Sequence, residues 1–101
     1  MPVDTARHPL FSLFLPQMRM TFPAILDKAM AIERVGFDGI ALMDHLAPPG
    51  VPSTAMYDGF ITAAAVAMRT ERLRIAHLVL CASFRHPAVL AKEAEIGRAH
   101  V

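Results

Sequence analysis

The sequence predicts an α/β fold in which short parallel strands alternate with helices. Three short apolar runs, at residues 10–15, 39–43 and 73–80, have the length of buried strands. Segments that favour helix follow them at residues 24–35, 57–68 and 88–94. The order strand, helix, strand, helix, strand, helix is typical of a parallel sheet wrapped by helices.

Composition limits the possible classes of protein. The 101 residues are enough for one small domain, with 54% hydrophobic and 19% charged residues. This apolar content suggests segments that something outside the chain covers. The net charge of +1 gives no reason to expect nucleic acid as a partner. No apolar run approaches the roughly 18 residues of a membrane span, and no secretory signal opens the chain, so we expect a cytoplasmic protein without a membrane partner.

The first strand and helix carry clear boundary signals. Pro9 and Pro16 flank residues 10–15, which favours a buried strand. Thr21 and Pro23 are typical of a helix start, and Gly36 can supply a left-handed C-cap. One apolar helix face is predicted from residues spaced three or four apart: Ile25, Ala29, Ile32 and Val35.

The later elements follow the same logic. The second apolar run ends abruptly at Asp44 and His45, before a proline-rich loop at residues 47–54. An alanine-rich helix at residues 57–68 precedes the third run, and Pro87 can open the third helix. Doubly wound sheets and barrels both fit this alternation. A dinucleotide-binding sheet would show a G-x-G-x-x-G motif after its first strand, where this chain has PQMR at residues 16–19.

Ligands of parallel α/β folds bind at the carboxyl ends of the strands, which singles out residues 16–17, 44–45 and 81–86. At the second of these, a carboxylate can orient an imidazole, and a histidine can transfer protons near neutral pH. The alternative for Asp44 and His45 is an aspartate that braces the loop beside an exposed histidine. Both interpretations stay open on sequence grounds.

The remaining polar residues have simpler interpretations. Arg85, just before a helix start, could grip a phosphate, but an arginine that pairs with a nearby acid to hold the loop is favoured. Cys81, the single cysteine, excludes an internal disulfide and is interpreted as a small buried hydrophobe. His77 could point into a barrel, although a packed, hydrogen-bonded core histidine is favoured. The spacing of His, Cys, Asp and Glu predicts no metal site.

Four segments, in order, resemble one known family. They are FSLFLPQ at residues 11–17, ERVGFDGI at 33–40, MDHL at 43–46 and FRHPAVLAK at 84–92. Together they resemble the first strand, the helix-to-strand passage, the end of the second strand and the third-helix entry of luciferase-like monooxygenases and their deazaflavin-dependent relatives. The resemblance covers roughly residues 10–94.

This resemblance implies the N-terminal β-α-β-α-β-α portion of a (β/α)₈ TIM barrel. It implies a reduced flavin mononucleotide (FMN) or a deazaflavin at the strand carboxyl ends, undetermined between the two, and a small organic substrate. By analogy His45 is the catalytic residue, while the cofactor-binding residues are Asp44, Leu78, Val79 and Cys81. In deazaflavin-dependent members a non-proline cis peptide bulges from the third strand, and the matching bond is Leu78–Val79. Full-length members are expected to be homo-oligomers.

A (β/α)₈ barrel needs eight strands, and this chain carries three. We therefore expect a fragment that is inactive, binds no FMN with useful affinity and tends to aggregate. The alternative is a small α/β binding or interaction module without catalytic activity. A flavodoxin-like regulatory domain is disfavoured because residues 16–17 offer neither an acidic cluster nor a phosphate loop.

The tail, EIGRAHV at residues 95–101, departs from the family pattern. Codons can be chosen for it that spell AG-ATC-GGA-AGA-GCA-CAC-GTC, the start of a common short-read sequencing adapter whose next triplet is a stop. We therefore predict that residues 1–94 are barrel sequence and that the tail from about Glu95 is non-native adapter read-through. The alternative is a native helix end capped by Gly97. Sequencing the source nucleotides tests this, and any other codons at these positions would refute it.

Overall fold

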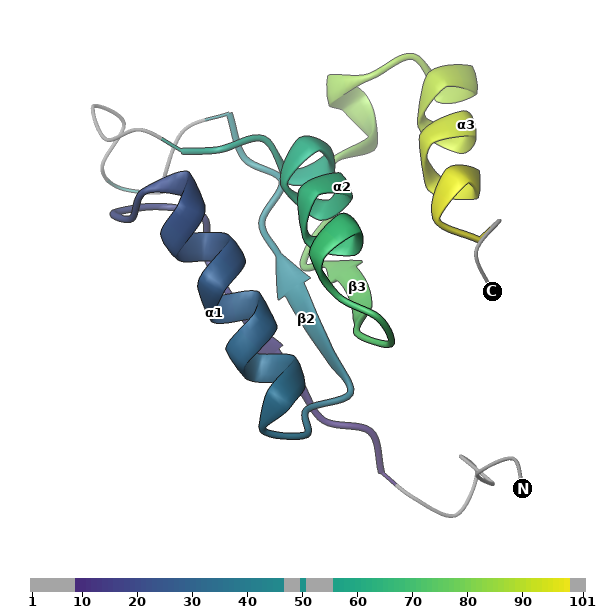
Figure 1. Ribbon diagram of the computed structural model, residues 1–101. Coiled ribbons are helices and arrows are strands. Elements are labelled where there is room, and N and C mark those ends of the chain that lie inside the picture. The colour runs from purple at the N-terminus through teal and green to yellow at the C-terminus, as the bar shows by residue number, and fades with distance from the viewer. Residues whose placement is uncertain (1–8, 47–49, 51–55, 99–101) are drawn as a thin grey trace.

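The computed structural model describes residues 9–46, 50 and 56–98, with side chains to residue 95, and its strands form one parallel sheet of order β1-β2-β3 (Figure 1). The elements are β1 (Ser12–Phe14), α1 (Phe22–Arg34), β2 (Gly39–Leu42), α2 (Gly59–Arg69), β3 (Arg74–His77), the 3-10 helix η2 (Ala82–Phe84) and α3 (Pro87–Arg98). The expected alternation of three strands and three helices is confirmed. Most of the proline-rich loop at 47–54 lies outside the described residues.

Helices α1 and α2 pack side by side on one face of the sheet (Figure 1). The strands pair in register, with Ile40 of β2 opposite Leu13 of β1 and Ile75 of β3. A doubly wound sheet would place helices on both faces, whereas a barrel wall carries them all outside. Parallel order with both packed helices on one face is therefore the arrangement of a barrel segment.

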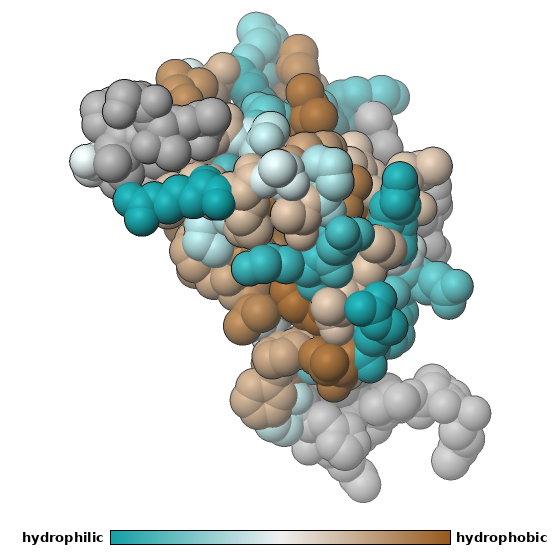
Figure 2. Space-filling model, turned by 60° about the vertical axis from the view of Figure 1, so that its left-hand side comes forward, coloured by the Kyte–Doolittle hydropathy of each residue, from teal (hydrophilic) through white to brown (hydrophobic). Residues whose placement is uncertain are grey.

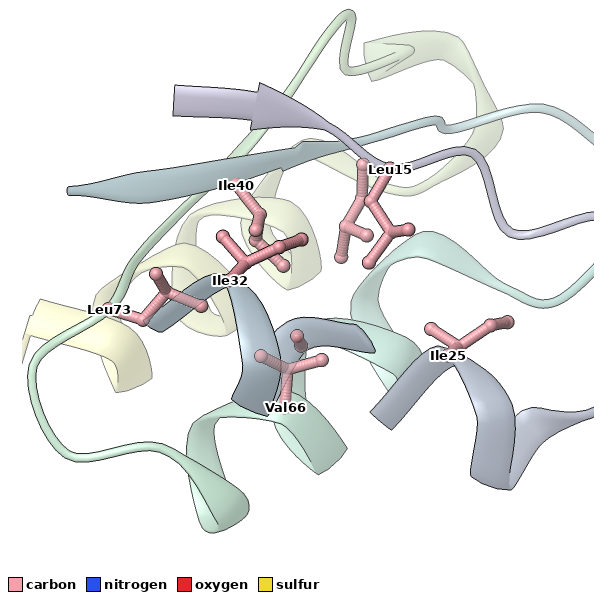
Figure 3. Packing of buried hydrophobic residues seen from close by; sticks show 8 residues of the cluster. Leu15, Ile25, Ile32, Ile40, Val66 and Leu73 are labelled. Atoms are coloured by element: carbon pink, nitrogen blue, oxygen red, sulfur yellow. The ribbon is translucent and has the colours of Figure 1, made fainter. Parts of the chain in front are cut away.

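The core lies between the sheet and these two helices (Figure 3). Ile25, Ile40, Leu42 and Val66 have almost no exposed surface. Burying a side chain of this size stabilises the fold by about 1.5–3 kcal/mol. The cluster of buried residues is completed by Leu15, Ala29, Ile32 and Leu73.

The boundaries of α1 follow local chemistry. The Thr21 hydroxyl accepts a hydrogen bond from the Ala24 amide at 3.2 Å, which satisfies one of the free N–H groups of the first turn. Gly36 has a φ of +103°, the left-handed conformation that a helix C-cap favours. The prediction that Val35 extends the apolar face was wrong. It is the C-cap residue and is 73% exposed, because the chain leaves the helix there.

The strands are shorter and less covered than predicted. We expected β1 to be buried, but Ser12, Leu13 and Phe14 are all exposed, because β1 is an edge strand paired only with β2 among the described residues. The run at 73–80 forms a strand only as far as His77. Figure 2 shows hydrophobic side chains reaching the surface among hydrophilic ones on the face turned forward.

Helix α3 begins at Pro87, as predicted, and continues to Arg98. Gly97 therefore lies inside the helix rather than after it. The proposed boundary at residue 94 coincides with no change in secondary structure, and the origin of the tail stays a prediction.

A carboxylate holds the amino-terminal end of the sheet together. Glu33, near the end of α1, accepts hydrogen bonds from the backbone amides of Glu71, Arg72 and Leu73, the shortest being 2.8 Å from Leu73. The Arg72 guanidinium donates back to the carbonyl oxygens of Glu33 and Phe37. These bonds, led by the Arg72 amide, lower the pKa of Glu33. These bonds thus join the end of α1 to the turn into β3, next to the buried side chains of Ile32 and Leu73.

We expect Glu33→Gln to lower the midpoint of thermal unfolding, because the amide NH₂ group would face N–H donors in place of an acceptor. The pKa of Glu33 is lowered, so its contribution is complete above the ordinary carboxyl value of 4.5 and is lost as the pH falls through the folded value. Circular dichroism melts across this range should show the wild-type advantage shrinking with acid. The exposed Glu71→Gln is the control, and equal melts for both variants would contradict the role of Glu33.

Candidate functional site

The carboxyl ends of β2 and β3 meet at one rim of the sheet. Leu78, after β3, donates its amide to the Leu42 carbonyl at 2.8 Å, and the Cys81 amide donates to Oδ2 of Asp44 at 2.8 Å. Asp44 and Cys81 therefore lie in direct contact. The sequence analysis placed both residues at the carboxyl ends of parallel strands, and their contact agrees with that placement. Antiparallel strands would have put them at opposite ends of the sheet.

Arg85 organises this rim. Its Nη1 lies 2.7 Å from Oδ2 of Asp44 and its Nη2 lies 2.8 Å from Oδ1, a bidentate ion pair. The guanidinium also lies 4.5 Å above the ring of Phe60, with Asp58 at 3.8 Å and Glu93 at 3.7 Å. The interpretation of Arg85 as a loop-holding partner of a nearby acid is confirmed, and nothing in this geometry leaves its fork free for a phosphate.

The electrostatics follow from these contacts. The hydrogen bonds from Arg85 hold the pKa of the Asp44 carboxyl below its ordinary value of 3.8, against the opposing effect of burial. The same bonds raise the pKa of Arg85. Both groups are therefore charged at any pH near neutrality, and the pair is a permanent structural contact rather than a proton donor.

Asp44 and His45 have different surroundings although they are neighbours. Asp44 is only 5% exposed, and both its oxygens are engaged, one of them by two donors. His45 is exposed. Of these two side chains, therefore, the His45 imidazole is the one that is accessible to a ligand.

The segment after β3 forms a turn beside this rim. The Leu78–Val79 peptide bond is cis, as the resemblance implies, and the two side chains are 58% and 65% exposed. Cys81 is partly buried, and its Sγ lies 3.2 Å from the Ser83 hydroxyl. The residues predicted to bind a cofactor thus share one rim, with exposed apolar side chains next to the imidazole-bearing strand end.

Gln17 has a structural role that the sequence did not reveal. Its side chain is fully buried, accepts from the Met43 amide at 2.7 Å and donates to the carbonyls of Met43 at 2.8 Å and Tyr57 at 3.2 Å. Beyond the last backbone pairs of β1 and β2, the Gln17 side chain therefore makes the hydrogen bonds to Met43 that a neighbouring strand would make. The sequence analysis singled out residues 16–17 as a possible ligand site because they follow a strand. In the structure, Gln17 uses this position to fix the backbone of Met43.

His77 packs on the helix side of β3. Its ring lies 5.0 Å from that of Phe60, and a side chain at Gly59 would approach within 3.1 Å of it. The expected packing is present, but the expected hydrogen bond is not, because Nε2 is buried without a partner among the described residues. Phe60 and Asp58 were not singled out, although Asp58 carries a local signal as the N-cap of α2, accepting from the Ile61 amide at 2.9 Å.

Parallel β/α units with helices on one face and polar residues at the carboxyl rim define a barrel-type α/β protein. The chain matches the luciferase-like monooxygenase family over residues 7–95, and it belongs to that family. No curated protein matches it.

Among solved structures, it is similar to an F420-dependent secondary alcohol dehydrogenase determined with an F420–acetone adduct, at a TM-score of 0.74 and 22% sequence identity. The match covers 83% of this chain and 26% of the dehydrogenase chain, so this chain spans about a quarter of that protein. The likeness confirms the barrel fold. Within the described residues, none of the helices has the length and apolar character to cross a membrane.

We expect Arg85→Lys to destabilise the fold by about 1.5–3 kcal/mol, because a lysine cannot make the bidentate contact with a buried carboxylate. Arg69→Lys, at the exposed end of α2, is the matched control and should change the unfolding free energy little. Since the pKa of Asp44 is lowered, the effect of Arg85→Lys should be constant above pH 3.8 and fade below it. Denaturant unfolding at several pH values measures this, and a loss equal to that of the control would refute the pairing as a stabilising contact.

Proposed function

We propose that this chain forms the first three β/α units of a flavin- or deazaflavin-dependent oxidoreductase acting on a small organic substrate. His45 is its catalytic residue, while Leu78 and Val79 form part of the cofactor site. The observation that carries the proposal is the exposed imidazole beside a fully engaged Asp44, on the rim it shares with these apolar side chains. Family membership supports the cofactor class.

The residues at the rim fit a flat, largely apolar ring. Leu78 and Val79 offer exposed hydrocarbon surface at the strand ends, which a ring system could cover. Cys81 lies next to them with its amide and its carbonyl already bonded, so it would contribute through its thiol. A deazaflavin is favoured over FMN by the neighbouring dehydrogenase structure, while the family description favours oxygen chemistry with reduced flavin.

Asp44 is proposed to act through its neighbours rather than by touching the cofactor. Its carboxylate fixes the Cys81 amide and Arg85, which sets the backbone on both sides of the site. When bound, a reduced flavin or deazaflavin would supply hydride or electrons. His45 would hold the accompanying proton at a ring nitrogen and donate it to the substrate that receives the hydride, a role for which imidazole is chemically suited. Leu78 and Val79 would exclude water.

This chain alone is proposed to be inactive. Its three strands supply one arc of the rim, and a barrel site draws on loops from several further strands, including a phosphate site after strands seven and eight. Titration of the 101-residue chain with FMN, followed by flavin fluorescence, should show no saturable binding. Binding in the micromolar range would contradict this part of the proposal.

The catalytic role is tested in a chimera. Residues 9–94 would replace the structurally equivalent segment of the F420-dependent dehydrogenase, and deazaflavin binding and hydride transfer would be measured separately. We expect the chimera to bind the deazaflavin, and His45→Ala to slow hydride transfer by about 10²–10⁴-fold with a much smaller effect on binding. Met68→Ala, at the far end of α2 and 84% exposed, is the control and should leave both unchanged.

Two outcomes would overturn the proposal. A folded chimera that binds neither deazaflavin nor FMN would show that this rim is not a cofactor site. A His45→Ala chimera that transfers hydride as fast as its parent would remove the catalytic role of His45.

A further inference from the structure

Gly59 lies where α2 begins, and it is buried directly against the carboxyl rim. A Cβ atom at this position would lie 2.8 Å from the carbonyl oxygen of Met43 and 3.1 Å from Cδ2 of His77. Non-bonded carbon atoms normally stay about 3.5–4.0 Å apart. The helix can therefore begin this close to Met43 and His77 only because residue 59 has no side chain.

The Met43 carbonyl is the neighbour of Gly59 that is least able to move. The Gln17 side chain donates to it at 2.8 Å and accepts from the Met43 amide at 2.7 Å. Gln17 is fully buried, so a displaced Met43 peptide would leave polar groups with neither a partner nor water. A side chain at residue 59 would therefore be accommodated by movement of other groups.

The two remaining ways to make room both displace Phe60. The His77 ring packs against that of Phe60, with 5.0 Å between their centroids, so pushing the imidazole aside pushes Phe60. A retreat of the first turn of α2 moves Phe60 as well, because it follows Gly59 in that turn. The Arg85 guanidinium lies 4.5 Å above the Phe60 ring, and this cation–π contact is worth less than two buried hydrogen bonds. A larger residue 59 would therefore remove the support of Arg85 before it disturbs the Met43 peptide.

We propose that Gly59 is a positioning residue for His45, an inference that rests on the proposed function. Because residue 59 has no side chain, α2 begins against the rim and keeps Phe60 under Arg85. Arg85 holds both carboxylate oxygens of Asp44, the residue that directly precedes His45. Gly59 thus acts on the imidazole through three intermediate residues and touches no ligand itself.

The structural half of the proposal is tested on the 101-residue chain with Gly59→Ala. Alanine favours helix more than glycine does, so helix propensity alone predicts a higher midpoint of thermal unfolding. We expect a lower midpoint, together with a changed shift of the Arg85 Hε signal, which the ring current of Phe60 affects. The Met43 amide signal should stay in place. Ala64→Ser, which adds one atom on the exposed side of α2, is the matched control and should leave the midpoint and both signals unchanged.

The positioning half is tested in the dehydrogenase chimera. We expect Gly59→Ala to slow hydride transfer by about 10–100-fold while the Kd for deazaflavin changes less than about threefold, because the imidazole is misplaced and the cofactor contacts remain. Phe60→Leu should slow hydride transfer similarly and serves as the second variant if Gly59→Ala does not fold. Phe60→Tyr keeps an aromatic face under Arg85 and should retain the parent rate. Ala64→Ser should again change nothing.

The outcomes separate this proposal from the one on which it rests. A Gly59→Ala chain that melts at or above the wild-type midpoint would overturn the role of Gly59. So would a Gly59→Ala or Phe60→Leu chimera with the parent rate in a series where His45→Ala is slow, or a Phe60→Tyr chimera as slow as Phe60→Leu. A His45→Ala chimera with the parent rate would overturn both proposals, since there would be no catalytic imidazole to position.

Discussion

The ion pair between Asp44 and Arg85 is the constraint on which the carboxyl rim depends. A carboxylate with 5% exposure is tolerated only when its oxygens are engaged, and here Arg85 and the Cys81 amide engage them. The guanidinium in turn contacts Asp58, the N-cap of α2, Phe60 in its first turn, and Glu93 of α3. One arginine therefore joins the end of β2, the turn after β3 and two helices.

The opposite end of the sheet is held by similar chemistry with a different purpose. Glu33 collects three backbone amides of the α2–β3 turn, and no exposed reactive group lies beside it in that cluster. At the carboxyl rim the braced Asp44 stands next to an exposed His45. In a barrel, residues at the amino-terminal face serve stability and those at the carboxyl face serve ligands. The Glu33 cluster fits the first of these roles, and the proposal for His45 assigns the second to the carboxyl rim.

Local signals were predictable from sequence, whereas long-range pairings were not. Thr21 and Gly36 act within one helix turn, so the residue type alone predicted both ends of α1. Asp44 and Arg85 were both recognised, but they lie 41 residues apart and only the fold selects each as the partner of the other. The burial of β1 was mispredicted. Apolar composition indicates that a strand is suited to a buried position, but it does not show whether a neighbouring element covers that strand.

The contacts that set the rim all come from within the described residues. Asp44 is positioned by Arg85 and Cys81, and Met43 is positioned by Gln17, which bonds both its amide and its carbonyl. The backbone that leads into His45 is therefore fixed on both residues before it by side chains from other elements. Ligand affinity is different, because a site open on one side exchanges water freely and gains little from each polar contact. Under the proposed assignment of His45, three β/α units would preform part of the site through these contacts, and the enclosure of a ligand is the part that they do not supply.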